Sequence, residues 1–387
     1  IIYTPTFGGN RIKLKEFGLE SEVYSINKEI AELSRIAVGN RLLFGNIAPT
    51  GMFVEPFGDL PFEEAINVFK EQTLALLDGG VDGIVIETML DIQEARAALI
   101  AVQETAPVPV MVSMTFNKDG RTLNGNDPES ALITLQHLGA DAVGCNCSTG
   151  PEDILKLIKL MKPIAKVPLF AKPNAGMPRL EKGRTVFDMS PMEFAKYIPE
   201  FIEAGINLIG GCCGTGPEHI AQIASVISGE KPSLSQEENY SAVTSARKTH
   251  YMGTMQPFTI VGERINPTGK KALQAELREG KLNLVKQFAL EQAHQGATIL
   301  DVNMGLSGID EKEMMLHSIR LLSRISDLPL CIDSTRVDVV EAALRLYPGR
   351  ALVNSISAET ERIEKTLPIA ARYGAMFILL PLTDEGI

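Results

Sequence analysis

The sequence predicts an α/β protein with two (β/α)8 barrels of the TIM type in tandem. A recurring unit carries this prediction: a helical stretch ends in glycine, a short aliphatic strand follows, and a polar residue closes the strand. Copies of the unit begin at Gly80, Gly139, Gly205, Gly296 and Gly374. Glycine adopts the left-handed conformation that ends a helix, and a continuous aliphatic run is typical of a strand buried in a parallel sheet. The polar residue falls at the carboxyl end of the strand, the face on which such barrels build their active sites.

The spacing of the strands divides the chain into domains. In the first half, strands are expected near residues 1–6, 41–48, 83–88, 109–115, 142–147, 168–174 and 208–212. A closed barrel has eight strands, so we expect the first domain, residues 1–228, to lack its opening strand. Residues 229–257 interrupt the pattern with glycine, proline and a polar run, which is typical of an interdomain linker.

The pattern restarts near residue 259, and we expect a second domain over residues 258–387. Its further strands are expected near residues 297–303, 329–333, 351–355 and 375–381. This makes about five strands, so we expect the second barrel to be cut before it closes, with exposed apolar strand edges. Five strands also fit a doubly wound open sheet, and periodicity alone leaves that alternative open.

Composition and charge exclude several classes of protein. Of 387 residues, 45% are hydrophobic and 22% are charged, which is typical of a folded globular protein. The net charge of −11 argues against nucleic acid or an anionic membrane as the main partner, because such partners need basic patches. The longest apolar stretch, near residues 377–382, is too short to span a membrane. With no signal peptide at the start, these observations favour the cytoplasm.

Cysteines cluster at two of the predicted strand ends. Cys147 closes one strand, and the adjacent pair Cys212 and Cys213 closes another within a glycine-rich segment. Three protein ligands with a fourth position open are typical of a catalytic zinc site. The alternatives are buried thiols that act as small hydrophobic residues and a strained disulfide between the adjacent pair. Cys145 alternates with Cys147 and is expected to face away from the site, and Cys331 is expected in the core.

An all-sulfur zinc site with an open position suits a further thiol as its substrate. Zinc deprotonates a thiol that binds to it, whereas a free thiol is mostly protonated at neutral pH. Glu87 and Asn174 lie at strand ends on the same rim, where they would hold the ammonium and a polar group of an amino-acid thiol. For Glu87, capping of the following helix is an equally good interpretation.

The motifs of the first half resemble those of the homocysteine S-methyltransferases. The resemblance rests on residues 144–152 (GCNCSTGPE), residues 210–219 (GGCCGTGPEH), the segment around Glu87 and residues 172–176 (KPNAG). It covers residues 1 to about 228. It implies that Cys147, Cys212 and Cys213 hold zinc, that zinc binds the homocysteine thiolate, and that Glu87 and Asn174 contact the homocysteine amino group. The opening strand that receives the amino-acid carboxylate in this family has no counterpart here.

The second half resembles the pterin-binding barrels. The resemblance rests on residues 262–269 (GERINPTG), 301–305 (DVNMG), 332–335 (IDST) and 354–357 (NSIS). It implies pterin or folate contacts from strand-end acids and amides, which suit the paired N–H donors of a pterin ring. The residues concerned are Glu263, Asn266, Asp301, Asn303, Asp333 and Asn354.

The two halves in this order resemble the cobalamin-dependent methionine synthases. The resemblance implies a methyltransferase that moves a methyl group from 5-methyltetrahydrofolate, by way of cobalamin, to zinc-activated homocysteine, giving methionine and tetrahydrofolate. Cobalamin would be bound by a further module of the same parent chain or by a separate corrinoid protein, so we expect these 387 residues alone to be incomplete. The alternatives are a fusion of the methyltransferase with a methylenetetrahydrofolate reductase, a pterin synthase-like second half, and a non-catalytic binder of zinc and folate.

Overall fold

The computed structural model describes residues 1–231 and 240–386 and divides into two compact units. The first unit comprises residues 1–136 and 140–238, and the second comprises residues 239–387 with residues 137–139. Residues 232–239, which belong to the segment expected as a linker, and residue 387 lie outside the described residues. Each unit is a mixed α/β structure around a parallel sheet. No helix among the described residues is long and apolar enough to cross a membrane.

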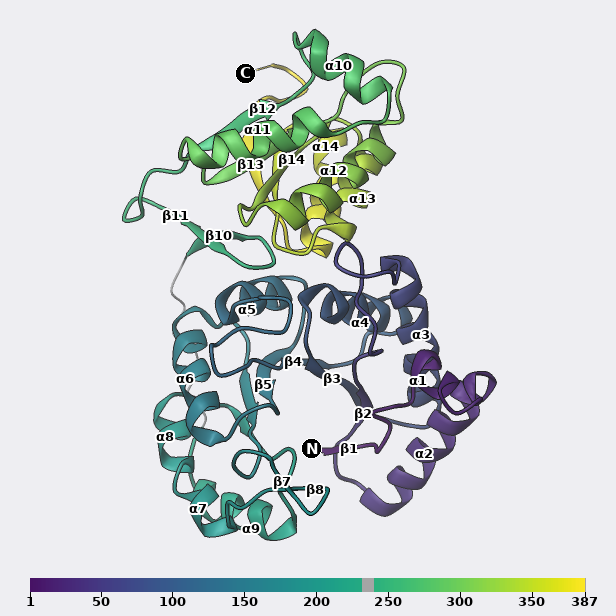
Figure 1. Cartoon of the computed structure of the whole chain (residues 1–387), viewed down its shortest axis with the longest axis vertical. Helices are drawn as coiled ribbons and strands as arrows, with labels where there is room; N and C mark the ends of the chain where they lie inside the picture. The colour runs from purple at the N-terminus through teal and green to yellow at the C-terminus, as the bar shows by residue number, and fades with distance from the viewer. Residues whose placement is uncertain (232–239, 387) are drawn as a thin grey trace. The chain divides into compact units, whose positions relative to one another are not determined.

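The first unit is built on a seven-stranded parallel sheet that curls around a common centre (Figure 1). Its strands, in spatial order, are β1 (Ile2–Tyr3), β2 (Leu43–Ile47), β3 (Gly83–Met89), β4 (Val110–Met114), β5 (Ala142–Asn146), β6 (Leu169–Lys172) and β9 (Leu208–Ile209). The strands expected from the aliphatic runs are therefore all present, with β1 and β9 as the edges. Because all the strands run in the same direction, their carboxyl ends meet on one face of the sheet.

Helices cover the outer side of the curled sheet (Figure 1). They are α1 (Arg11–Lys15), α2 (Val23–Val38), α3 (Phe62–Asp78), α4 (Ile92–Thr105), α5 (Pro128–His137), α6 (Pro151–Met161), α7 (Pro191–Ala195), α8 (Ile198–Glu203) and α9 (Pro217–Ile227), with short 3-10 turns at Glu20–Glu22 and Lys162–Ile164. An antiparallel hairpin that the sequence analysis did not predict, β7 (Arg179–Glu181) with β8 (Arg184–Val186), lies between β6 and α7.

Side chains on the inner side of the first sheet change from apolar to polar along the strands. The lower layer is an apolar cluster to which successive strands contribute Phe44, Val85, Met111, Ala142 and Phe170. Strand side chains alternate between faces, so residues two positions later point inward in the next layer. That layer holds polar residues at the carboxyl ends of the strands: Asn46, Glu87, Ser113 and Lys172. The apolar layer thus forms the floor of a polar site.

The second unit repeats this plan with a five-stranded parallel sheet. Its strands, in order, are β12 (Val261–Ile265), β13 (Ile299–Asn303), β14 (Leu330–Asp333), β15 (Leu352–Ser357) and β16 (Met376–Leu380). Its helices are α10 (Lys271–Arg278), α11 (Asn283–His294), α12 (Glu311–Ile325), α13 (Val337–Leu346) and α14 (Thr360–Arg372). Strand β16 is an edge, and its apolar side chains from Phe377 to Leu380 are exposed, as the sequence predicts.

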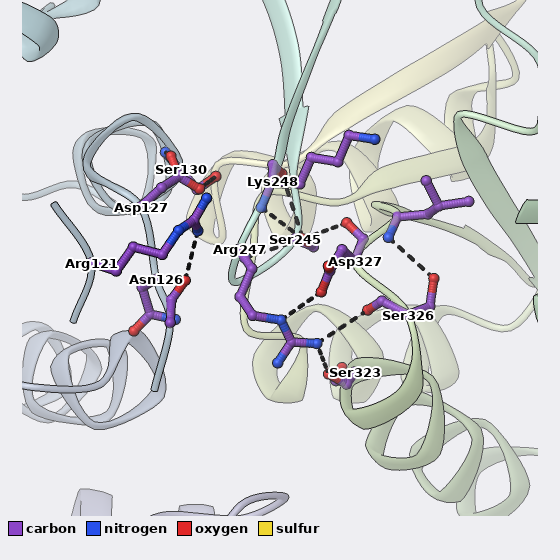
Figure 2. A network of polar contacts seen from close by, with 12 residues as sticks. Arg121, Asn126, Asp127, Ser130, Ser245, Arg247, Lys248, Ser323, Ser326 and Asp327 are labelled. Carbon is purple, nitrogen blue, oxygen red and sulfur yellow. Dashed lines mark hydrogen bonds and ion pairs between the residues drawn. The ribbon is translucent and has the colours of Figure 1, made fainter. Parts of the chain in front are cut away.

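Part of the segment expected as a linker is a hairpin of the second unit. Strands β10 (Ser241–Thr244) and β11 (Thr249–Met252) pair antiparallel, so regular structure begins well before residue 258. Val243 and Met252 pack against the inward residues of β13, β14 and β15. At the turn of the hairpin, Arg247 Nε lies 2.6 Å from Asp327 Oδ1 and Ser245 Oγ donates to the Asp327 carbonyl (Figure 2). The hairpin therefore closes the floor of the second sheet.

The Tyr347 side chain links this hairpin to β14 by hydrogen bonds, and replacing the hydroxyl tests that role. The buried Tyr347 hydroxyl donates to the Thr244 carbonyl at 2.9 Å and accepts from the Leu330 amide at 3.0 Å. In Tyr347→Phe both backbone groups lose this hydrogen bond, at a cost of about 1 kcal/mol for each bond. We expect faster hydrogen exchange in residues 241–252, measured by mass spectrometry. Tyr373→Phe, whose hydroxyl meets Arg345 Nη1 only at 3.5 Å, is the control; equal exchange in the two variants would contradict this account.

Candidate metal and substrate sites

Three cysteine thiols meet at the carboxyl ends of β5 and β9. Cys147 follows β5, Cys212 and Cys213 follow β9, and their sulfur atoms all lie within 4.8 Å of one another. The Sγ atoms of Cys147 and Cys213 are 3.7 Å apart. Among the described residues, this is the group of His, Cys, Asp and Glu side chains that is compact enough to hold a metal ion. The juxtaposition expected from the sequence is therefore present.

The backbone around the end of β6 holds the thiols in place. The Lys172 carbonyl accepts from the Cys147 amide at 3.1 Å, and the Pro173 carbonyl accepts from the Cys212 amide at 2.8 Å. Cys147 itself has a positive φ of 61°. Residues other than glycine rarely adopt this backbone conformation, and those that do are concentrated at functional sites. One strand end thus fixes thiols that are 65 residues apart in the chain.

Asn174 supports the cysteine pair directly. Its Oδ1 accepts from the Cys213 amide at 3.2 Å, and the residue is only 2% exposed. The expected contact of Asn174 with an amino-acid substrate stays a prediction. One acceptor site of the Asn174 side chain is already occupied by a backbone amide. This supporting role is not predictable from the sequence pattern alone.

The thiols perturb one another. A hydrogen bond with Cys212 is the main cause that lowers the pKa of Cys147, and the same contact, together with burial, raises the pKa of Cys212. Burial raises the pKa of Cys213 as well. Cys145 faces away, as predicted: it is buried with its Sγ 3.6 Å from Met161 Sδ on α6. A metal ion bound by the thiols would displace the proton that Cys147 and Cys212 share.

The geometry of the cluster fits a tetrahedral zinc ion. Zinc–sulfur bonds of about 2.3 Å in tetrahedral coordination place the sulfur atoms about 3.8 Å apart, close to the 3.7 Å between Cys147 and Cys213. Cys147 and Cys212 are partly buried while Cys213 is exposed, so one side of the cluster is open. Three thiols with an open side suit a catalytic site better than a closed structural one.

Glu87 lies in the polar layer next to the thiols and is paired there with a lysine. Its Oε2 forms an ion pair with Lys172 Nζ, and its Oε1 accepts from Asn46 Nδ2 at 2.6 Å. The Glu87 and Lys172 side chains are only 8% and 12% exposed. The alternative of Glu87 as a helix cap is not supported, since Asp91 directly precedes α4. Glu87 therefore belongs to the site, but with a cation of the protein already beside it.

Lys172 and Tyr3 are site residues that the sequence analysis missed. Lys172 Nζ lies over the Tyr3 ring, 4.2 Å from its centroid. Burial, followed by the charges of Glu87 and Cys212, raises the pKa of the Tyr3 hydroxyl. Both residues line a cavity of about 260 Å³ between β1, β6 and β9. For Lys172 the available signal was its position two residues after the inward Phe170, which alternation along a strand predicts. Tyr3 pairs with Phe44 and packs against the apolar layer, and this register cannot be read from the sequence.

His219, which follows the cysteine pair in the sequence, has a structural role at the start of α9. Its Nδ1 accepts from the Gly216 amide at 3.2 Å at the start of α9, and its Nε2 lies 3.1 Å from the Met189 carbonyl. Both ring nitrogens are thus engaged with backbone groups. This leaves the fourth position of the thiol cluster to another ligand.

In the second unit, the expected pterin contacts from β13, β14 and β15 lie together. Asn354 Nδ2 donates to Asp301 Oδ1 at 3.2 Å, and Asn303 Nδ2 donates to Asp333 Oδ2 at 2.9 Å. These side chains form the layer above Ile299, Cys331 and Leu352, which belong to the apolar floor. The arrangement gives two carboxylates with amide partners at one rim. Asp301 Oδ2 is buried and meets no N–H or O–H donor among the described residues. The Cys331 thiol next to this carboxylate is only a weak donor, so the oxygen can accept from a ligand donor.

The acids of this rim are crowded. Burial is the main cause that raises the pKa of Asp301 to about 6, with further increases from the charges of Asp333 and Glu263. Burial, with the charge of Glu263 as a further cause, also raises the pKa of Asp333. Cys331 is buried in the core, as predicted, and burial, followed by the charge of Asp301, raises the pKa of its thiol. A ligand that donates hydrogen bonds would relieve this crowding.

The two expected contacts on and after β12 differ from the others. Glu263 is exposed but close enough to raise the pKa of Asp301 and Asp333 by its charge. Asn266 Oδ1 accepts from the Thr268 amide at 2.9 Å within its own loop. The structure therefore brings Glu263 to the rim, whereas the Asn266 side chain stabilises a turn. Its contact with a pterin stays a prediction.

A parallel α/β fold with a metal-competent thiol cluster at its strand ends defines the class of protein. Residues 1–227 match the homocysteine S-methyltransferase family, and the chain belongs to this family. Residues 262–385 match the pterin-binding enzyme family. The two matches correspond to the two units, each with its own sheet. The family supports a methyltransferase.

Solved structures are similar to part of this chain. The metallated form of the homocysteine methyltransferase MmuM from Escherichia coli is 22% identical with a TM-score of 0.50, over 58% of this chain and 78% of that one. Its apo form is 22% identical with a TM-score of 0.44, over 53% of this chain and 73% of that one. The carboxyl transferase domain of Rhizobium etli pyruvate carboxylase with pyruvate is 13% identical, with a TM-score of 0.36, over 55% of this chain and 35% of that one.

Proposed function

We propose that the chain provides the homocysteine-binding and folate-binding units of a cobalamin-dependent methionine synthase, residues 1–228 and 258–387. The reaction would move the methyl group of 5-methyltetrahydrofolate to homocysteine, giving methionine and tetrahydrofolate. In this proposal both units are parts of (β/α)8 barrels, and the protein acts in the cytoplasm, where thiols stay reduced. The observation that carries the proposal is the cluster of Cys147, Cys212 and Cys213 next to Glu87.

The first unit would hold zinc through Cys147, Cys212 and Cys213. Zinc bound there would deprotonate, at neutral pH, a thiol that takes the open position. The residues of the chain would do the rest: Glu87 would bind the ammonium of homocysteine, Asn174 would hold the cysteine pair, and the apolar layer below would exclude water. The donor set supports zinc because thiolates suit this ion.

The second unit would bind the pterin ring of the folate through Asp301, Asn303, Asp333 and Asn354, with Glu263 at the rim and Asn266 in the adjoining loop. A carboxylate accepts two parallel N–H bonds, and a pterin edge offers them. The buried Asp301 Oδ2, which meets no N–H or O–H donor among the described residues, supports this role. Each substrate would lie at the strand ends of its own sheet, and in this proposal a carrier moves the methyl group from one substrate to the other. Cobalamin on a separate module or a corrinoid protein would be that carrier.

The proposed reaction is tested by supplying different methyl donors to the zinc-loaded chain with homocysteine. Methionine would be measured by mass spectrometry with methylcobalamin, 5-methyltetrahydrofolate alone, or S-methylmethionine as the donor. We expect methionine from methylcobalamin and none from 5-methyltetrahydrofolate unless a corrinoid is added. Turnover with S-methylmethionine and not with methylcobalamin would instead assign a homocysteine methyltransferase that needs no corrinoid.

Binding of folate is expected to depend on pH through Asp301. Its pKa is raised to about 6, so the carboxylate is charged above that pH and protonated below it. Because the charged form accepts two N–H bonds, affinity for tetrahydrofolate should fall as the pH drops through this value, by up to about tenfold per pH unit. Calorimetric titration at several pH values measures this. Asp301→Asn should bind weakly and lose the pH dependence, and an unchanged profile in this variant would assign the titration to another group.

A further inference from the structure

One buried amide joins the thiol cluster to the strand end that carries Glu87. Asn146 is the last residue of β5, directly before Cys147, and it is 1% exposed. Its Oδ1 accepts from the Thr88 amide at 2.9 Å and from Ser113 Oγ at 2.7 Å. Its Nδ2 donates to Thr88 Oγ1 at 2.8 Å and lies 3.7 Å from Cys212 Sγ. All the hydrogen-bonding capacity of this side chain is therefore in use.

The orientation of the amide follows from its partners. Oxygen and nitrogen of an asparagine side chain are assigned from the hydrogen-bond network. The Thr88 backbone N–H is a donor only, so the atom that faces it must be Oδ1. This leaves Nδ2, with its two hydrogens, to the Thr88 hydroxyl and to the sulfur of Cys212. Asn146 therefore presents an N–H group, and not an oxygen, to Cys212.

Thr88 is a residue that needs such a partner. It has a positive φ of 63°, which is unfavourable for a β-branched side chain, and the pairing of β3 with β4 shifts register between Ile86 and Met89. Such irregularities in strands re-aim side chains next to active sites. Asn146 binds both the amide and the hydroxyl of Thr88, so it fixes the irregular strand end directly after Glu87.

We propose that Asn146 is a positioning residue that couples the aim of Glu87 to the sulfur of Cys212 by an N–H···S hydrogen bond. The inference rests on the proposed metal site, which the sulfur of Cys212 would share. A donor next to a metal-bound thiolate offsets part of its charge, and groups in this position tune the affinity and electronic properties of the metal. One side chain thereby positions the Glu87 carboxylate, which would bind the substrate, and donates a hydrogen bond to the Cys212 sulfur, which would bind the metal.

The test compares Asn146→Asp with Ser113→Ala. The aspartate keeps the shape and an acceptor for Thr88, but it replaces the N–H that faces Cys212 by a negatively charged oxygen. Ser113→Ala removes one hydrogen bond to the same amide and leaves the N–H···S contact intact. Affinity for Zn²⁺ would be measured by competition with a chromophoric chelator, and the thiolate-to-metal charge-transfer bands would be recorded with Co²⁺. Far-UV circular dichroism of each variant reports whether it is folded.

In Asn146→Asp we expect a loss of zinc affinity of roughly tenfold to a hundredfold and shifted cobalt bands, both absent in Ser113→Ala. If the aspartate variant does not fold, Asn146→Ala carries the test with the same expected loss. Unchanged affinity and bands in a folded Asn146 variant, or an equal loss in Ser113→Ala, would overturn the role of Asn146 while leaving the metal site standing. Wild-type protein that binds neither ion would overturn the metal site and this inference together.

Discussion

Replacing Cys212 with alanine is expected to remove bound zinc from the chain, from about one ion per chain to a residual fraction. The sulfur atoms of Cys147, Cys212 and Cys213 lie within 4.8 Å of one another, so each would bond to the same ion. With two thiols left, the site keeps half of a tetrahedral shell. The measurement is zinc per chain by inductively coupled plasma mass spectrometry after dialysis against a weak chelator.

Cys145→Ala is the matched control for this loss. Cys145 lies two residues from Cys147 but faces Met161 on α6, so its removal changes the core and not the cluster. This variant should keep its zinc. X-ray absorption of the wild type would add a second readout, because homocysteine in the open position should appear as a new sulfur ligand. Folded wild-type protein without zinc, or equal zinc in both alanine variants, would mean that the three thiols do not form a zinc site.

The fold was predictable because its signal is local and repeated. Several strands follow a glycine that ends a helix, as at Gly139 before β5 and Gly296 before β13, and most of the strands are aliphatic runs. The hairpin of β10 and β11 was not predicted, because its polar sequence resembles a linker. Only its contacts with the second sheet, such as those of Tyr347 and Val243, give it a defined structure.

The candidate site was predictable where the chemistry is carried by rare residues. Three cysteines at strand ends indicate a metal site without any structure. Lys172 and Asn146 were missed because lysine and asparagine are common at strand ends and usually cap a helix or face solvent. Their roles depend on which residues of other strands lie opposite them, Glu87 for Lys172 and Cys212 for Asn146. The register and curl of the sheet decide this, and a single sequence does not contain them in a readable form.

Breaking the ion pair of Glu87 and Lys172 from either side is expected to destabilise the first unit strongly. Both side chains are nearly buried, so Lys172→Met leaves a carboxylate with Asn46 as its remaining partner, and Glu87→Gln leaves a buried ammonium. Removal of one partner of a buried pair costs about 3–5 kcal/mol. Pulse proteolysis in urea, which follows each unit by its fragment, would measure the loss. The double variant Glu87→Gln with Lys172→Met carries no unpaired charge and should lose less stability than either single variant.

The same variants decide how an amino-acid thiol would share this site. If Glu87 binds the ammonium of homocysteine, Lys172 competes for the same carboxylate, since its Nζ already pairs with Oε2. Lys172→Met should then increase the preference for homocysteine over 4-mercaptobutyrate, its analogue without the amino group, and Glu87→Gln should abolish that preference. Titration of zinc-loaded protein with both thiols measures it. The contrary result is a folded Lys172→Met variant that no longer binds homocysteine and shows no preference between the two thiols. That result would show that Lys172 itself binds the substrate, through the carboxylate of homocysteine.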